Sequence, residues 1–260
     1  MKNIKEVFNI VWYVVCWNEM AILPHIINYW KQIARKVVVY DNGSTDGTLE
    51  YLSTFDWIEI RHFNSGDKIN DLLYLQIKNE SWKEQKNKNV DFVIVSDVDE
   101  VIWSNNLLDE LQFYKKNKIS IVKPTGYDFI SPIFPLYDGK LLHEKIKNCC
   151  RRPLCDKCVL IDPNLVENIS YSPGCHYLNS FKSGGELSIN NKLLLFHFKN
   201  LSCEYLIMRN HNLAQRLSDI NLKNGWGFHY LKNKNEIIDE FNNNLNEASK
   251  LNIDDILANN

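Results

Sequence analysis

The amino-acid sequence predicts an α/β fold, in which a mostly parallel, Rossmann-like sheet is flanked by helices. Two observations support this class. Short runs rich in Val, Ile and Tyr alternate along the chain with segments whose apolar residues recur at helical spacing. The runs at Val11–Cys16 and Lys36–Tyr40 are apolar at almost every position, which is typical of strands covered on both faces and hence of parallel sheets. With 260 residues, of which 45% are hydrophobic, the chain is long enough to bury a sizeable core.

The first half of the chain contains four expected strands and two main helices. The expected elements are, in order, a strand at Val11–Cys16, a helix around Leu23–Ile33, a strand at Lys36–Tyr40, a turn-rich loop at Asp41–Thr48, a strand at Ile58–Phe63, a helix at Ile69–Lys86 and a strand at Phe92–Ser96. Pro24 is tolerated in the first turn of its helix. Asp46 is placed to cap a short helix that follows the loop.

The second half of the chain has a weaker pattern. Residues 125–176 contain five of the seven prolines, which predicts loops and short strands. Helical spacing returns from Ser202 to Leu217. In the polar segment 231–260, we expect Ile237, Ile238 and Phe241 to pack along one face of a helix.

This pattern divides the chain into three parts without a flexible linker or an internal repeat. We expect a nucleotide-binding core at residues 1–124 and a loop-rich lobe at residues 125–230. The lobe is expected to complete the same domain rather than to fold alone. Residues 231–260 are expected to form a helical tail.

The composition excludes several classes of protein. A net charge of −2 gives no electrostatic reason to expect a nucleic-acid partner. The N-terminal residues are apolar, but Glu6 and Asn9 interrupt them and no small-residue cleavage site follows, so we expect no secretion signal. No other run approaches the ~20 apolar residues of a membrane span. The seven cysteines are unevenly spread, and the expected location is the reducing cytoplasm.

Polar clusters follow three of the expected strands. They are Asn18-Glu19, Asp41-Asn42 and the run from Asp97 to Glu100. In an open α/β sheet, ligands bind beyond the carboxyl ends of the strands. We therefore expect the three clusters to line one crevice.

The last of these clusters, Asp97-Val98-Asp99-Glu100, indicates a divalent cation. In an extended segment Asp97 and Asp99 face the same way, and such carboxylates repel each other unless a cation lies between them and a polyphosphate. Their hard oxygen atoms suit Mg²⁺ or Mn²⁺. The alternative is a solvated turn after the strand, with Glu100 capping a helix.

A set of motifs spread over residues 8–230 resembles a known family. The motifs are Asn18-Glu19, DNGSTDGT at 41–48, DVDE at 97–100, Asn79-x-x-Trp82-Lys83, Asp156-Lys157, PGCH at 173–176, HFK at 197–199, RNHNLAQRLS at 209–218 and GWGFHY at 225–230. Together they resemble the family 2-like glycosyltransferases of the GT-A fold, especially bacterial enzymes that build capsule or lipooligosaccharide. The resemblance implies transfer of a sugar from a nucleoside diphosphate donor, with a uridine diphosphate sugar expected, to a hydroxyl of a surface glycan.

The resemblance also implies roles for individual residues. The implied catalytic residues are Asp97, Asp99, Glu100 and His176. The implied donor-binding residues are Glu19, Asp41, Asn42, Asn79, Asp97, Lys157 and Arg209. Asp41 would bind the uracil or ribose, and Lys157 and Arg209 would bind the diphosphate. Mn²⁺ or Mg²⁺ would bind Asp97, Asp99 and His176. The acceptor would be an oligosaccharide or a lipid-linked glycan, which leaves peripheral association with the inner face of the membrane open.

Two further questions concern histidine and the catalytic base. His176 follows a Pro-Gly turn and is preferred as a site residue over His197, which follows an apolar run and is expected to be nearer the core. Asp128 and Asp138 lie beyond the DVDE box, where an inverting enzyme would need a base. No Glu-Asp pair of the common family pattern is present there, which leaves the stereochemical outcome open.

The cysteines raise the alternative of a structural zinc site. Cys155-x-x-Cys158 has the spacing of half a site. The adjacent pair Cys149-Cys150 is a poor second half for tetrahedral ligation. Buried reduced thiols are therefore the preferred interpretation.

Two other classes of protein compete with the glycosyltransferase. A sugar-1-phosphate nucleotidyltransferase would need a glycine-rich loop bearing Arg and Lys directly after the first strand, where this chain has WNEM. A non-catalytic carbohydrate-binding protein on the same fold would not need the intact DVDE box. Measured donor hydrolysis separates the enzyme from the binding protein.

Overall fold

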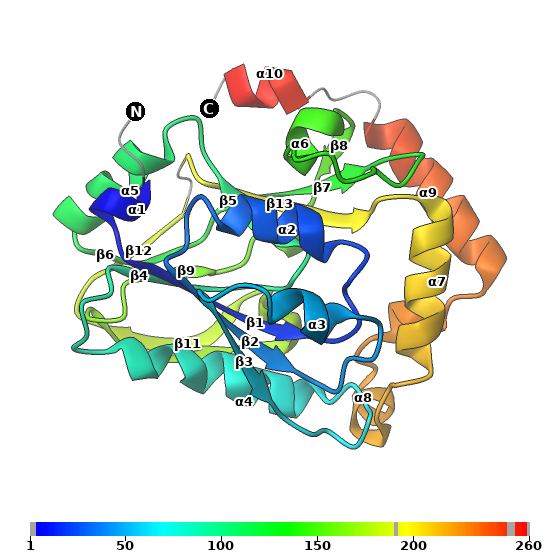
Figure 1. The fold of residues 1–260 in the computed structure, drawn as a ribbon, viewed down its shortest axis with the longest axis horizontal. Helices are drawn as coiled ribbons and strands as arrows, with labels where there is room; N and C mark the ends of the chain where they lie inside the picture. Colours follow the sequence, from blue (N-terminus) through cyan, green and yellow to red (C-terminus); the bar gives the residue numbers. More distant parts are fainter. Residues whose placement is uncertain (1–3, 190–191, 249–252, 259–260) are drawn as a thin grey trace.

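A seven-stranded sheet forms the centre of the computed structural model, which describes residues 4–189, 192–248 and 253–258 (Figure 1). The strand order is β12-β6-β9-β4-β1-β2-β3. The strands are β1 (Ile10–Cys16), β2 (Lys36–Asp41), β3 (Ile58–His62), β4 (Phe92–Val95), β6 (Ile119–Val122), β9 (Leu160–Ile161) and β12 (Glu186–Ser188). All neighbours pair in parallel except β9, which is antiparallel to β4 and β6. The predicted α/β class with a mostly parallel sheet is confirmed.

The four strands expected in the first half all form, and each begins and ends within one residue of its predicted bounds. The apolar runs of β1, β2 and β4 are buried because both faces of the sheet are covered, whereas the edge strand β3 is only partly buried. Alternate residues of β1 belong to different hydrophobic clusters, since side chains along a strand point to opposite faces. Trp12 packs with Trp30 on one face, whereas Tyr13 and Trp82 belong to the cluster on the other.

The two main helices that the sequence predicts against the sheet are shorter in the structure than expected. The helices that cover the sheet are α2 (Leu23–Trp30), α3 (Thr48–Leu52), α4 (Asp71–Glu80) and α5 (Leu107–Lys116), and the 3₁₀ turn η1 (Ser81–Gln85) follows α4. The predicted helix Ile69–Lys86 is therefore an α-helix capped by the side chain of Asn70, followed by a tighter turn. The Asp46 carboxylate accepts the backbone N–H of Thr48 at 3.1 Å, so it binds the start of α3 as expected.

Much of the loop-rich lobe forms strands of a second sheet. Its order is β5 (Glu100–Trp103), β13 (Leu194–Asn200), β7 (Thr125–Ile130) and β8 (Cys149–Arg151). A separate hairpin joins β10 (Val166–Tyr171) to β11 (Leu178–Ser183). Because Glu100 begins β5, the alternative in which it caps a helix is wrong. Both sheets contain strands from either side of residue 124.

The C-terminal part of the chain is helical, as predicted. It contains α7 (Cys203–Ala214), α8 (Asp219–Asn224), η4 (Phe228–Leu231), α9 (Lys234–Ala248) and α10 (Ile253–Ala258). Ile237 and Phe241 of α9 are buried, and Ile238 is half-buried. The predicted tail 231–260 includes residues 249–252 and 259–260, which lie outside the described residues. The remaining short elements are α1 (Ile4–Val7), α6 (Leu142–Lys145), η2 (Pro153–Cys155) and η3 (Pro173–Cys175).

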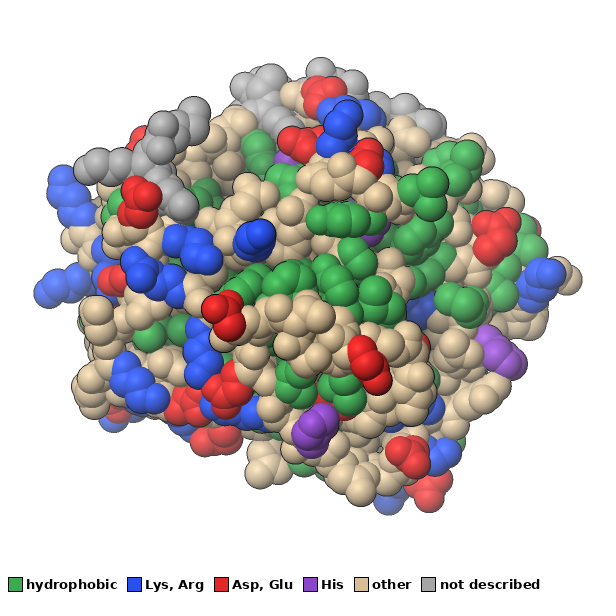
Figure 2. Space-filling view, viewed as in Figure 1, with side chains coloured by type: hydrophobic (Ala, Val, Ile, Leu, Met, Phe, Trp, Pro, Cys, Tyr) green, Lys and Arg blue, Asp and Glu red, His purple; other side chains and the backbone are tan. Residues whose placement is uncertain are grey.

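The surface includes an apolar segment between β7 and α6. Ile133 and Leu136 are 76% and 83% exposed there. The segment contacts α2, because the His25 ring lies 3.0 Å from the Pro135 carbonyl oxygen and packs edge-on against Tyr137. On the face drawn in Figure 2, hydrophobic side chains form a band across the middle, and Lys and Arg side chains gather toward the left. None of the helices in the described part of the chain is long and apolar enough to cross a membrane.

The stacked pair of Trp12 and Trp30 anchors α2 to the sheet, and its removal is expected to destabilise the fold. The ring centroids are 4.7 Å apart, and Trp30 is 0% exposed. We expect Trp30→Ala to lower the free energy of unfolding by about 3–5 kcal/mol, because it removes a large buried side chain and leaves a cavity. Urea denaturation followed by circular dichroism measures this change. Phe113→Ala, at a side chain that is 55% exposed, is the control and should cost less than about 1 kcal/mol. Equal losses in the two variants would contradict this account of the core.

Candidate functional site

The three polar clusters that follow β1, β2 and β4 lie side by side at one edge of the main sheet. These strands are direct neighbours in the order β4-β1-β2 and run in parallel, so their carboxyl ends share that edge. The backbone N–H of Asn18 donates to Ser44 Oγ at 2.9 Å, and that of Glu19 donates to Thr48 Oγ1 at 3.1 Å. The predicted convergence of the clusters is confirmed.

Asp41 and Asn42 hold the loop after β2 in place. The Asp41 side chain is fully buried, and its carboxylate accepts the backbone N–H groups of Gly43 at 2.9 Å and Ser44 at 3.1 Å. The Asn42 amide donates to the Tyr74 hydroxyl at 2.9 Å. Both side chains therefore have structural partners here. Their predicted contacts with a nucleotide stay predictions.

Asp97 is held between two lysines. Its two oxygens lie 2.5 Å from Lys78 Nζ and 2.7 Å from Lys157 Nζ. Burial alone would raise the pKa of Asp97, but the ammonium groups of Lys157 and Lys78 hold it well below its usual range. Since each oxygen already has a cationic partner, this arrangement does not offer Asp97 as a free metal ligand, which runs against its predicted metal role.

Glu100 is the most buried member of the DVDE box. It is 0% exposed, and one of its oxygens lies 2.6 Å from Lys157 Nζ. The other oxygen accepts the backbone N–H of Asp97 at 3.0 Å. Lys157 therefore pairs with two carboxylates, whose charge it balances together with Lys78, and Glu100 fixes the turn between β4 and β5.

Asp99 faces a different set of cations. Its Oδ2 atom lies 3.5 Å from His197 Nε2 and 3.4 Å from Arg209 Nη2. Burial would raise the pKa of Asp99, but the nearby His197 and Arg209 lower it well below its usual range. Asp99 is therefore ionised at the edge of the sheet, with an imidazole nitrogen beside it.

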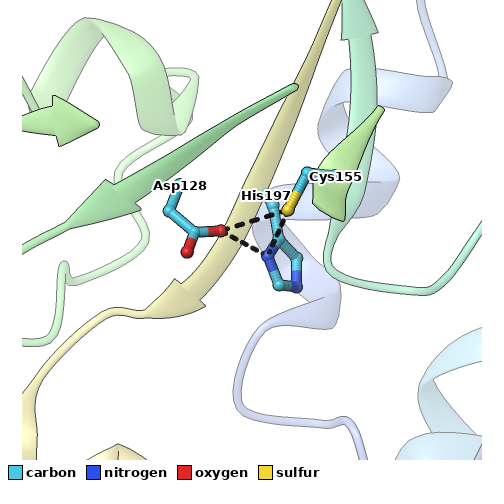
Figure 3. A group of neighbouring side chains, drawn as sticks. All are labelled: Asp128, Cys155 and His197. Carbon is cyan, nitrogen blue, oxygen red and sulfur yellow. Dashed lines mark hydrogen bonds and ion pairs between the residues drawn. The ribbon is translucent and has the colours of Figure 1, made fainter. Parts of the chain in front are cut away.

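His197 is oriented by a second carboxylate, Asp128, as Figure 3 shows. The two atoms His197 Nδ1 and Asp128 Oδ1 are 2.6 Å apart, and the Cys155 Sγ atom lies 3.4 Å from the same Asp128 oxygen. Burial raises the pKa of Asp128, but His197 and Arg152 lower it to about 2, so this carboxylate can only accept. Nδ1 therefore donates to Asp128, and Nε2 faces Asp99. Burial would lower the pKa of His197, but Asp99, Cys155 and Asp128 raise it well above its usual range.

Within the residues that the structure describes, Asp128, Cys155 and His197 are the one group with three possible ligand atoms within 4.8 Å of one another. The short Nδ1–Oδ1 contact is a hydrogen bond, so these two atoms satisfy each other rather than leaving room for an ion. Asp97, Asp99 and His176 do not form such a group. The structure therefore does not bring the three predicted metal ligands together.

His176 has a different environment from the one predicted. Its Nδ1 lies 2.6 Å from the Leu154 carbonyl oxygen, to which it donates, and the side chain is half-buried. Burial lowers its pKa, and Lys157 adds to this effect. The preference for His176 over His197 is not supported by the contacts, because His197 is the histidine that lies beside Asp99.

Glu19 and Arg209 link the start of the chain to its C-terminal helices. Arg209, on α7, lies 3.1 Å from Glu19 Oε1 and reaches Asp99 with the same nitrogen. Burial raises the pKa of Glu19 to about 7 against the opposing effect of Arg209. Arg209 is thus placed at the predicted crevice, but its contact there is with carboxylates of the chain itself.

Asn79 and Lys78 are neighbours on α4 with different functions in the structure. The Asn79 side-chain oxygen accepts the backbone N–H of Tyr171 at 2.9 Å and ties α4 to β10. Its predicted donor contact stays a prediction. Lys78, which the sequence analysis did not single out, is the residue that reaches Asp97. A buried lysine one position before Asn79 has no distinctive pattern in the sequence.

The zinc alternative finds no support in the cysteine positions. All seven cysteines are free thiols. Cys158 lies in a hydrophobic cluster with Tyr13 and Ile161, whereas Cys155 contacts Asp128 and His197. Since the two side chains have different surroundings, the Cys155-x-x-Cys158 spacing does not form half of a zinc site.

Comparison with known proteins finds similarity only among solved structures. No protein-family model matches the sequence, and no curated protein matches it. A crystal structure of S. aureus TarS is 15% identical with a TM-score of 0.43, and the match covers 91% of this chain but only 43% of that one. Structures of TarS residues 1–349 in complex with UDP and with UDP-GlcNAc are each 14% identical, with TM-scores of 0.44 and 0.43, over 70% and 72% of those chains. These values are too low to carry an argument about activity.

Removing Lys157 is expected to destabilise the fold, because it leaves Glu100 buried without a cation. We expect Lys157→Met to lower the free energy of unfolding by about 3–5 kcal/mol, as is usual when one partner of a buried ion pair is lost. Urea denaturation measures this loss. Lys182→Met is the matched control, since Lys182 pairs with Glu167 at the surface and both side chains are more than half exposed. The control should change stability by less than about 1 kcal/mol. A Lys157 variant as stable as the control would show that Glu100 does not need this partner.

Proposed function

We propose that the chain is a metal-dependent, family 2-like glycosyltransferase of the GT-A type. It would transfer a sugar from a uridine diphosphate donor to a hydroxyl of a surface glycan, in capsule or lipooligosaccharide synthesis. The observation that carries the proposal is the pair of Asp99 and His197 at the carboxyl edge of the parallel sheet. The motifs DNGSTDGT and DVDE, which the resemblance to this family rests on, border the same edge.

The pair of Asp99 and His197 has the chemistry of a metal site. A carboxylate oxygen and an imidazole nitrogen 3.5 Å apart are close enough to bind one ion. A metal-binding histidine usually donates its other ring N–H to a carboxylate, and Asp128 accepts that proton here. The nitrogen ligand favours Mn²⁺ over Mg²⁺, which prefers oxygen atoms throughout. We therefore assign the metal to Asp99 and His197 rather than to Asp97 and His176.

In this proposal, the residues around the metal site have different roles. A bound metal would neutralise negative charge that develops on the leaving diphosphate. Arg209 lies beside Asp99 and is positioned to bind the same diphosphate once its contact with Glu19 loosens. Asp41 and Asn42 hold the loop on which the nucleoside would rest. Lys78 and Lys157 keep Asp97 ionised and fixed, so Asp97 is available to the ribose through hydrogen bonds rather than to the metal.

The acceptor in this proposal is an oligosaccharide or a lipid-linked glycan. The exposed apolar segment around Ile133 and Leu136 supports a lipid-linked acceptor and peripheral contact with a membrane. Asp128 is a weak choice for the catalytic base, because His197 and Arg152 already occupy its two oxygens. A nucleotidyltransferase would transfer a nucleotidyl group to a sugar phosphate, and a carbohydrate-binding protein would transfer nothing, so detection of sugar transfer to an acceptor separates both from this proposal.

The metal assignment predicts that Asp99→Asn and His197→Gln lose Mn²⁺-dependent binding of uridine diphosphate. Each removes one of two metal ligands, and calorimetric titration of uridine diphosphate with and without Mn²⁺ measures the loss. Asp128→Asn should weaken binding by about 10–100-fold, the usual effect of removing a group that orients a metal-binding histidine.

His176→Gln is the matched control, since it makes the same chemical change at the other candidate histidine. It should keep metal-dependent binding within about threefold of the wild type, because a group outside the metal site makes little difference to the metal. Loss of binding in His176→Gln with retention in His197→Gln would overturn the assignment. Circular dichroism of each variant confirms that it is folded.

A further inference from the structure

A polar cavity has Asp128 in its wall. Its volume is about 120 Å³, and its walls come from β7, β13, α7, η4 and α9. One water molecule needs ~10–15 Å³ of such space, so the cavity has room for several water molecules. This is room for a charged substituent of a sugar.

The charged groups in the cavity walls are compensated with one exception. Arg152 donates to Asp128 at 3.1 Å, and Glu240 pairs with Lys232 at 2.7 Å. Lys199, which also lines the cavity, has no hydrogen bond or ion pair with any described residue. Burial, followed by the charge of Arg209, lowers the pKa of Lys199, so an anion bound directly to its ammonium group would be favourable.

A second polar group in the walls also lacks a partner. Asn210 is 4% exposed, and its side-chain oxygen is buried without a hydrogen bond from any described residue. Leaving a buried acceptor unpaired is unfavourable, so a ligand hydroxyl that donates to it would stabilise the complex. His229 also lines the cavity. Burial, followed by the charges of the nearby Lys199 and Arg209, lowers the pKa of His229 to about 3. Positive charge thus prevails around this ring.

The position of the cavity relates it to the proposed reaction. Asp128 lies in its wall and also binds His197, which faces Asp99. Asn210 follows Arg209 on α7, and Arg209 contacts Asp99. The cavity is therefore adjacent to the proposed metal site. None of its described lining residues belongs to the loops that follow β1 and β2, so we assign it to the acceptor rather than to the donor nucleoside.

We propose that this cavity binds an acid group of the acceptor, a carboxylate or a phosphate ester, whose neighbouring hydroxyl donates to Asn210. Lys199 would pair with the acid group. This inference rests on the proposed function and adds to it the class of acceptor: an acidic glycan or a polyol phosphate rather than a neutral sugar.

The test uses four probes on the full chain with Mn²⁺, first without and then with uridine diphosphate. They are a methyl glucuronide, glycerol 1-phosphate, inorganic phosphate and the neutral methyl glucoside. Saturation-transfer NMR and calorimetry give their affinities. We expect the glucuronide, the phosphate ester or both to bind, and the neutral glucoside to bind at least about tenfold more weakly, as is usual when a charge-assisted pair is missing.

Three variants make the test specific. Lys199→Gln should weaken binding of the acidic probe by about tenfold or more, and Asn210→Asp, which places a negative charge in the wall with little change in shape, should do the same. Lys223→Gln removes an equivalent charge from an exposed position on α8 and should leave the affinity unchanged. Asn210→Asp keeps the test decisive if Lys199→Gln fails to fold.

Several outcomes would overturn the proposal. They are equal binding of the neutral glucoside, binding of inorganic phosphate alone, an unchanged affinity in both Lys199→Gln and Asn210→Asp, and displacement of the acidic probe by uridine diphosphate. The last outcome would show that the cavity belongs to the donor. Metal-dependent binding of uridine diphosphate is measured in the same samples, so a failure of the acceptor proposal is distinguishable from a failure of the proposed function.

Discussion

The structure depends on the compensation of three carboxylates that follow β4 within four positions. Asp97, Asp99 and Glu100 are negative groups at the end of a buried strand, and isolated charges there would be costly. Their cationic partners come from four distant elements: Lys78 from α4, Lys157 from the segment before β9, His197 from β13 and Arg209 from α7. These contacts join the second sheet and the C-terminal helices to the edge of the main sheet, which makes the charge cluster both the proposed site and the junction of the fold.

The second sheet explains why His197 rather than His176 lies in this cluster. Strand β13 runs between β5 and β7, and its register sets His197 opposite Glu100 on one side and Asp128 on the other. The imidazole has Asp128 at Nδ1 and Asp99, the residue before Glu100, at Nε2. The Pro-Gly turn before His176 fixes the backbone locally, but it does not direct the ring toward Asp99. The register of β13, and not the local turn before His176, therefore determines which histidine lies beside Asp99.

The sequence predicted four of the seven strands of the main sheet, β1 to β4, and the runs of β1, β2 and β4 are almost uniformly apolar. It also predicted that three polar strand ends would converge, since neighbouring parallel strands end at a common edge. Strands β6, β9 and β12, which have only four, two and three residues, were not predicted. It did not predict the second sheet, because β5 and β8 are only four and three residues long and pair with strands far away in the sequence. The partners of the carboxylates depend on those long-range pairings. Lys78 and the role of Asp128 were therefore visible only in three dimensions.

The central claim is that Asp99 and His197 together bind a divalent metal, and pulsed electron paramagnetic resonance of bound Mn²⁺ tests it most directly. A coordinated imidazole couples its nitrogen to the electron spin, which gives a modulation that ¹⁵N labelling of histidine shifts. The account predicts this coupling in the wild-type protein with uridine diphosphate, its loss in His197→Gln and its persistence in His176→Gln. Absence of any nitrogen coupling in the wild type, or loss of the coupling only in His176→Gln, would contradict it.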